Sequence, residues 1–379
     1  MKPIPYGRQM IDAADRAAVD KVLRSPWLTQ GPSVEAFENA LASACGAKYA
    51  VACSNGTTAL HLACVAAGLG PGDEAVVPAI TFAATANAAL YCGAEPVIVD
   101  IRPDTLTIDP AAFAKALTRP TKAVLPVHFA GLPADMAEIS RIARKKKIVV
   151  IEDAAHALGA YYRGRAIGAC DRSDMAILSF HPVKHVATGE GGAVLTNRKD
   201  LRDRLRLYRS NGITRDKGLL EDKGQGGWYY EMQALGFNYR LTDMQAALGT
   251  SQLKKLPLFL KRRREIATLY TDAFGGDARI RLQAFPADRE HAWHLFVVRC
   301  GAEERDALLA HLHERGVRAQ VHYYPVPLQP WFRGRRGESA FPRAVAHART
   351  ALSLPMHAAL TDEQQTRVLE LLHSWRRAR

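Results

Sequence analysis

The sequence is poor in cysteine, and its cysteines lack the spacing of a metal site. The six cysteines of the 379-residue chain include no C-x-x-C pair, so we expect no bound metal. Single cysteines in apolar stretches are typical of core residues in a reduced, cytoplasmic protein. Met1 to Met10 lack the apolar core of a secretion signal, and no apolar run is long enough to cross a bilayer. We therefore expect a cytoplasmic protein that does not associate with a membrane.

Acidic residues are fewer than basic ones. The chain has 51 lysines and arginines against 38 aspartates and glutamates, which gives a formal net charge of +13. This charge is compatible with nucleic acid, with an acidic small substrate such as a nucleotide, or with a solvated basic surface. The basic runs, such as Arg141 to Lys147, are not interleaved with aromatic residues as in single-strand binders. We therefore expect no nucleic-acid partner.

Short β-rich apolar runs alternate with amphipathic segments between about Lys48 and Asn197. This alternation predicts an α/β fold with an open, mostly parallel central sheet and helices on both faces. The predicted strands are Tyr49–Cys53, Glu74–Val77, Glu95–Val99, Ala123–Val127, Ile148–Ile151, Met175–Ser179 and Ala193–Thr196, and the predicted helices are Thr57–Ala67, Thr81–Cys92, Pro110–Leu117 and Met136–Lys146. Ligands bind such sheets at the carboxyl ends of the strands, so polar residues just after strands are site candidates.

The character of the sequence changes near residue 250. A polar, glycine-rich loop is predicted from Asn211 to Gly227, after a charged helix. The later predicted elements are a helical pattern from Thr242 to Phe274 interrupted at Pro257, a strand over Trp293–Cys300, a helix over Ala302–Arg315 and a strand over Ala319–Tyr323. We therefore predict a large domain over residues 1–250 and a smaller C-terminal α+β domain over residues 251–379.

The run Ser54–Thr58 stands between a predicted strand and a predicted helix. The first turn of a helix offers free N–H groups and a partial positive charge, and Gly56 permits a tight turn. The hydroxyls of Thr57 and Thr58 can add donors, so the run is a candidate phosphate cradle. An ordinary N-cap built from the same residue types is the alternative.

A carboxylate follows the predicted strand Ile148–Ile151. Asp153 should lie at the carboxyl edge of the sheet, where it can pair with a protonated ring nitrogen of a bound cofactor. His156 follows and could place an imidazole against the same ring. A helix cap for Asp153 and a core histidine for His156 are the alternatives.

A lysine follows the predicted strand that ends at Ser179. Lys184 in a desolvated crevice would lose proton affinity and could form an imine with an aldehyde. Most lysines are solvated surface groups. Lys184 is a candidate because its strand should end beside the strands that precede Ser54–Thr58 and Asp153. No dinucleotide fingerprint competes, since Gly68, Gly70 and Gly72 follow a predicted helix and lack the G-x-G-x-x-G spacing.

Five segments together carry a resemblance to a known family. They are Ser54–Thr57, Pro78–Phe82, Glu152–His156, Ser179–Lys184 and Gly236–Asp243. The chain resembles the sugar aminotransferases of the DegT/DnrJ/EryC1/StrS family over nearly its whole length. The resemblance implies the fold of type I enzymes that use pyridoxal phosphate.

The resemblance also implies residue roles. Lys184 would carry the cofactor as a Schiff base and Asp153 would pair with its pyridine nitrogen. Phe82 would stack on the ring and His156 would lie close to it. The phosphate would be bound by Thr57, Thr58 and Ser179, and by Asn238 of a second subunit, which implies a homodimer with shared active sites.

Segments at both ends of the chain resemble, within this family, the transaminases that form UDP-4-amino-4,6-dideoxy-N-acetyl-β-L-altrosamine for pseudaminic acid. That resemblance implies a UDP-linked keto sugar as substrate and glutamate as amino donor. The residues implied to border the nucleotide sugar are Tyr6, Pro26, Trp27, Leu28, Thr29, Arg240, Gln320, Val321, His322 and Tyr323. Perosamine- or bacillosamine-type aminotransferases share much of this pattern, and a non-catalytic regulator with the same fold is a further alternative.

Overall fold

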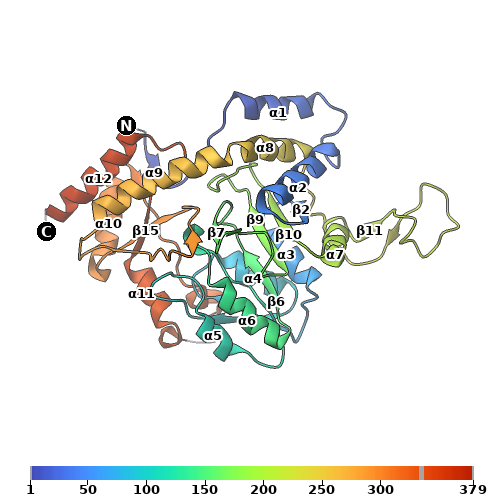
Figure 1. The fold of residues 1–379 in the computed structure, drawn as a ribbon, viewed down its shortest axis with the longest axis horizontal. Helices are drawn as coiled ribbons and strands as arrows, with labels where there is room; N and C mark the ends of the chain where they lie inside the picture. Colours follow the sequence, from blue (N-terminus) through green and yellow to red (C-terminus); the bar gives the residue numbers. More distant parts are fainter. Residues whose placement is uncertain (1, 333–336, 378–379) are drawn as a thin grey trace.

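A seven-stranded mixed sheet forms the centre of the protein in the computed structural model, which describes residues 2–332 and 337–377 (Figure 1). Its strand order is β2-β10-β9-β6-β5-β3-β4. The strands are β2 (Tyr49–Cys53), β3 (Glu74–Pro78), β4 (Glu95–Val99), β5 (Thr121–Val124), β6 (Val149–Asp153), β9 (Met175–Ser179) and β10 (Gly192–Thr196). Only β10 among them runs antiparallel to its neighbours. The predicted α/β fold is confirmed, with a mixed central sheet.

Helices cover both faces of this sheet because its side chains alternate between two apolar cores. One core joins alternate residues such as Val51 and Ile177 to helices α3, α4 and α7, and the other joins Ala52 and Leu178 to α2, α5, α6 and α8. The helix bounds are α2 Pro32–Cys45, α3 Gly56–Ala66, α4 Ala83–Tyr91, α5 Pro110–Ala116, α6 Met136–Lys146, α7 Lys199–Arg209 and α8 Asp243–Lys254. The N-terminal helix α1 (Ala13–Leu23) lies along α8 (Figure 1).

A third apolar core belongs to the C-terminal part of the chain and to Ile4 near the N-terminus. It is built around the three-stranded sheet β13-β15-β17. The bounds here are α9 Leu256–Phe274, β13 Arg281–Leu282, β15 Phe296–Arg299, α10 Ala302–Glu314, α11 Pro342–Thr350, β17 Ala351–Leu354 and α12 Asp362–Arg377. The proposed domain boundary after residue 250 falls inside α8 and stays a prediction.

The prediction of a strand over Ala319–Tyr323 is wrong. The chain instead forms the two-residue strand β16 (Val317–Arg318), which pairs with β1 (Ile4–Pro5), and then a single bridge at Gln320. Beyond that bridge the peptide between His322 and Tyr323 is cis, and both side chains line the cavity described below. The segment is thus a loop in which Ala319 and His322 are buried and Val321 and Tyr323 are half-buried.

Short strands complete the fold. β7 (Tyr161–Tyr162), β8 (Arg165–Ala166) and β14 (Arg289–Glu290) form one small sheet, and β11 (Ile213–Thr214) pairs with β12 (Glu231–Met232). The segment between β11 and β12 extends away from the rest of the molecule (Figure 1). None of the helices within residues 2–332 and 337–377 combines the length and the apolar character needed to span a bilayer.

Candidate active site

The carboxyl ends of β2, β6 and β9 meet at a cavity of about 440 Å³. These strands point the same way because β10 is antiparallel to both β2 and β9. Of the residues predicted from the sequence, the cavity is lined by Tyr6, Thr57, Phe82, Asp153, His156, Ser179, Lys184, His322 and Tyr323. The volume lies in the range of small-molecule sites, so the cavity can hold a cofactor together with part of a substrate.

The first turn of α3 forms one wall of the cavity. Asn55 caps the helix by accepting a hydrogen bond from Thr58 N at 2.8 Å, which leaves the N–H groups of Gly56 and Thr57 without intrahelical acceptors. A Cβ on Gly56 would lie 2.9 Å from Ser179 Cβ, so only glycine allows this turn to pack on the end of β9. This wall is suitable for a phosphate, because it offers free amide donors, the hydroxyls of Thr57 and Ser179, and the positive end of the helix dipole.

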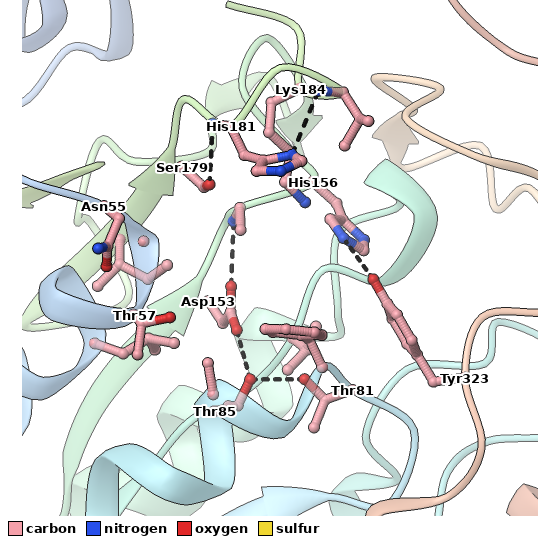
Figure 2. Close-up of a pocket in the computed structure, with 18 of the residues that line it drawn as sticks. Asn55, Thr57, Thr81, Thr85, Asp153, His156, Ser179, His181, Lys184 and Tyr323 are labelled. Atoms are coloured by element: carbon pink, nitrogen blue, oxygen red, sulfur yellow. Dashed lines mark hydrogen bonds between the residues drawn. The ribbon is translucent and has the colours of Figure 1, made fainter. Parts of the chain in front are cut away.

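Asp153 lies at the floor of the cavity, at the end of β6 (Figure 2). Its Oδ2 accepts a hydrogen bond from Thr85 Oγ1 at 2.7 Å, and its Oδ1 accepts one from Ala155 N at 3.2 Å. Thr85 Oγ1 is in turn 2.7 Å from Thr81 Oγ1. These bonds fix the orientation of a buried carboxylate, as a partner for a cationic ring nitrogen requires.

Lys184 brings an amine to the same cavity from the loop after β9. Burial lowers the pKa of Lys184 to about 8, and the Asp153 carboxylate opposes this effect only in part. About a tenth of the amine is therefore unprotonated at pH 7, far more than for a free lysine, and this is the form that attacks a carbonyl carbon.

Aromatic and imidazole rings form the remaining wall. Tyr323 OH lies 3.3 Å from His156 Nε2 (Figure 2). The ring centroid of Phe82 is 6.2 Å from that of Tyr323. Burial holds the pKa of His156 well below its usual value, so this imidazole is neutral. Phe82 is 60% exposed, which leaves its ring free to cover a bound group.

Several predicted residues lie outside the lining of this cavity. The Thr58 hydroxyl donates to Asn55 O at 2.8 Å within the helix cap. Asn238 and the four residues Pro26 to Thr29 are exposed, as is Gln320, and Arg240 and Val321 are half-buried. A single chain therefore brings together the predicted cofactor residues other than Thr58 and Asn238, but only part of the predicted sugar-binding set.

Sequence reasoning missed three residues of the site. Thr81 and Thr85 orient Asp153, and His294 lies 3.4 Å from Lys184 through its Nε2. Thr81 and Thr85 are four residues apart in the predicted helix Thr81–Cys92, a spacing that could have suggested a shared face, although α4 itself begins only at Ala83. His294 precedes a strand 110 residues after Lys184, and no local pattern links the two.

The sequence profile of the DegT/DnrJ/EryC1/StrS aminotransferase family matches residues 9–373. The chain belongs to this family. Spore coat polysaccharide biosynthesis protein SpsC from Bacillus subtilis is 38% identical to this family member over 374 residues, 97% of this chain and 95% of SpsC. The enzyme is thus a nucleotide-sugar aminotransferase that depends on pyridoxal phosphate.

Two solved structures of sugar aminotransferases share the fold. The PLP form of the putative sugar aminotransferase Spr1654 from Streptococcus pneumoniae is 30% identical, with a TM-score of 0.90 over 97% of both chains. PseC from Helicobacter pylori, an aminotransferase of pseudaminic acid biosynthesis, is also 30% identical, with a TM-score of 0.90 over 98% of this chain and 99% of PseC. The cradle, the fixed carboxylate and the buried amine described above fit pyridoxal phosphate.

Proposed function

We propose that this aminotransferase moves an amino group from glutamate to the C4 keto group of a UDP-linked 4-keto-6-deoxy-N-acetyl sugar, forming UDP-4-amino-4,6-dideoxy-N-acetyl-β-L-altrosamine. The observation that carries the amino-transfer part is the Lys184 amine, with its lowered pKa, in one cavity with Asp153 and a phosphate cradle. The sugar is supported by the likeness to PseC and by Tyr6, His322 and Tyr323 in the cavity wall.

A different keto sugar is the second candidate. SpsC, which acts in spore coat polysaccharide synthesis, is 38% identical, whereas PseC is 30% identical. This difference supports a keto sugar other than the precursor of the altrosamine product, and a perosamine- or bacillosamine-type nucleotide sugar is the alternative that we propose.

The residue roles form part of the proposal. Lys184 Nζ holds the cofactor covalently, Asp153 faces the ring nitrogen, and Phe82 and His156 cover the ring. Thr57 and Ser179 bind the phosphate, and Thr58 supports the cradle through its bonds to Asn55 in the helix cap. When bound, pyridoxal phosphate supplies an aldehyde that captures amines and a ring that draws electrons from the adjoining carbon.

Lys184 also acts on protons in this scheme. Once glutamate has displaced it, the free amine accepts the proton from the α-carbon of glutamate and later returns a proton to C4 of the sugar. A pKa of about 8 suits both directions of this transfer near neutral pH.

A second copy of the chain completes the site in this proposal. Asn238 is exposed and lies in the segment whose Tyr239 O accepts a hydrogen bond from Ser54 N at 2.9 Å, next to the α3 cradle. Large exposed apolar side chains lie on the flanking segments, namely Trp27, Leu28, Trp228, Met232 and Leu235. Burial of these side chains between two copies would stabilise a homodimer. We further propose that the enzyme acts in the cytoplasm.

The test is a product assay. Purified enzyme with pyridoxal phosphate and glutamate is incubated with UDP- and dTDP-linked 4-keto sugars, and product masses and 2-oxoglutarate release are measured. We expect amination of the UDP-linked N-acetyl 4-keto sugar, and the Lys184→Arg variant serves as the inactive control. Amination of a different keto sugar alone would replace the altrosamine assignment, and no 2-oxoglutarate with any of them would overturn the function.

A further inference from the structure

His294 lies within hydrogen-bonding distance of the Lys184 amine. The distance from His294 Nε2 to Lys184 Nζ is 3.4 Å. His294 is 4% exposed, and no described residue offers a hydrogen bond to its buried Nδ1. Burying an imidazole nitrogen and an amine without hydrogen bonds would lower the stability of the fold. We therefore read the 3.4 Å contact between His294 and Lys184 as a hydrogen bond.

The backbone around His294 is held from two sides. Arg263 from α9 donates through Nη1 to Trp293 O at 2.9 Å and to His294 O at 3.3 Å. On the other side Leu295 N donates to Ala130 O. Gly131 has a φ of +103°, and a Cβ there would lie 3.0 Å from His294 N, so only glycine permits this approach. The position of His294 is thus set independently of Lys184.

The charge state of His294 follows from its surroundings. Burial, and then the Lys184 cation, hold the pKa of His294 well below its usual value; His156, His185 and Arg263 act in the same direction. The ring of His156 lies against it, with centroids 4.2 Å apart. Lys184 itself also faces the Asp153 carboxylate. His294 is therefore neutral, and with a proton on Nδ1 its Nε2 can only accept a hydrogen bond.

We propose that His294 is a positioning residue for Lys184, whose Nε2 accepts a hydrogen bond from the lysine ammonium whenever that amine is not joined to the cofactor. This inference rests on the proposed function, in which Lys184 is released and recaptured in each half-reaction. A free lysine side chain has many rotamers, and an acceptor in a fixed place keeps the amine in the cavity between the two steps. The imidazole acts through Lys184 and need not touch the substrate.

The test measures Lys184 itself rather than turnover. Full-length, cofactor-free wild type, His294→Gln and His294→Phe are labelled with limiting acetic anhydride across pH 6–11, and modification of the Lys184 peptide is quantified by mass spectrometry. The loss of an acceptor from an ammonium weakens its proton affinity about tenfold, so we expect the labelling midpoint of His294→Phe to fall by about one pH unit. His294→Gln, whose amide oxygen reaches near the Nε2 position, should keep the wild-type midpoint.

Two outcomes would overturn the proposal. One is a wild-type midpoint in His294→Phe, and the other is an equal fall in His294→Gln, which would make the effect one of packing. If His294→Phe does not fold by circular dichroism, His294→Asn replaces it, because its shorter amide does not reach the Nε2 position. Because labelling needs neither cofactor nor substrate, either result leaves the proposed aminotransferase reaction to its own product assay.

Discussion

The hydrogen bond from Thr85 to Asp153 gives a sharp test of how the site is held together. Thr85→Val keeps the shape of a fully buried side chain and removes only its hydroxyl. Asp153 then loses the 2.7 Å hydrogen bond at Oδ2 and keeps the 3.2 Å bond from Ala155 N. Hydrogen bonds to charged groups contribute about 1.5–3 kcal/mol, and Thr81 also loses its 2.7 Å partner. We expect the free energy of unfolding to fall by about 2–3 kcal/mol.

The assay is urea denaturation of the cofactor-free protein at pH 7. Thr107→Val is the matched control, because Thr107 is also fully buried and its hydroxyl hydrogen-bonds the neutral Thr105 hydroxyl at 2.9 Å rather than a carboxylate. That control should lose about 1 kcal/mol. If Thr85→Val loses no more than Thr107→Val, the Asp153 carboxylate is not stabilised as a charged group and the reasoning about the site is refuted.

Three further predictions use the same denaturation assay. The pKa of Lys184 is about 8 in the folded protein, against 10.5 for a free lysine, so protonation of this amine destabilises the folded state. Lys184→Met should therefore raise the free energy of unfolding by about 3 kcal/mol at pH 7. This gain should fade as the pH rises from 8 to 10.5, and a pH-independent gain would contradict it. Burial lowers the pKa of His291 to about 3 from 6.5, so the unfolded chain binds the extra proton and stability is lost as the pH falls from 6.5 toward 3. His291→Asn should reduce that slope by up to about 1.4 kcal/mol per pH unit, and an unchanged slope would show that His291 is not the group responsible. A Cβ at Gly192 would lie 2.3 Å from Asn55 O, so Gly192→Ala should cost about 1–3 kcal/mol, whereas Gly70→Ala, with no atom within 4 Å, should cost little; equal costs would contradict the close packing of α3 on β10.

The strands that position the site were predictable from the sequence. Tyr49–Cys53 and Met175–Ser179 have the predicted bounds, because each is a short apolar run with turn or polar residues at its ends. The strand predicted over Ile148–Ile151 covers Val149–Asp153, so Asp153 is the last residue of its strand, whereas Lys184 follows β9 as predicted. The direction of β10 did not, since a fully buried strand reads alike whether it runs parallel or antiparallel.

The contacts that hold Asp153 and Lys184 were not predictable. Thr85 is 68 residues from Asp153, so their contact exists only once α4 has packed against β6. His294 is 110 residues from Lys184, so their contact also requires the C-terminal part to pack on the sheet. The predicted strand over Ala319–Tyr323 is absent for a related reason. His322 is buried against the cavity and bonds Ser353 of β17 through its side chain, so the segment is held by long-range side-chain contacts rather than within a sheet.

The central claim is that one amine, Lys184 Nζ, holds the cofactor. Reduction of the holoenzyme with borohydride should fix pyridoxal phosphate irreversibly, and mass spectrometry of the digest should find the added mass on the peptide that contains Lys184. The Lys184→Arg variant, which keeps the positive charge, should acquire no such label. A label on a different lysine, or an unlabelled wild-type protein after incubation with the cofactor, would contradict the account.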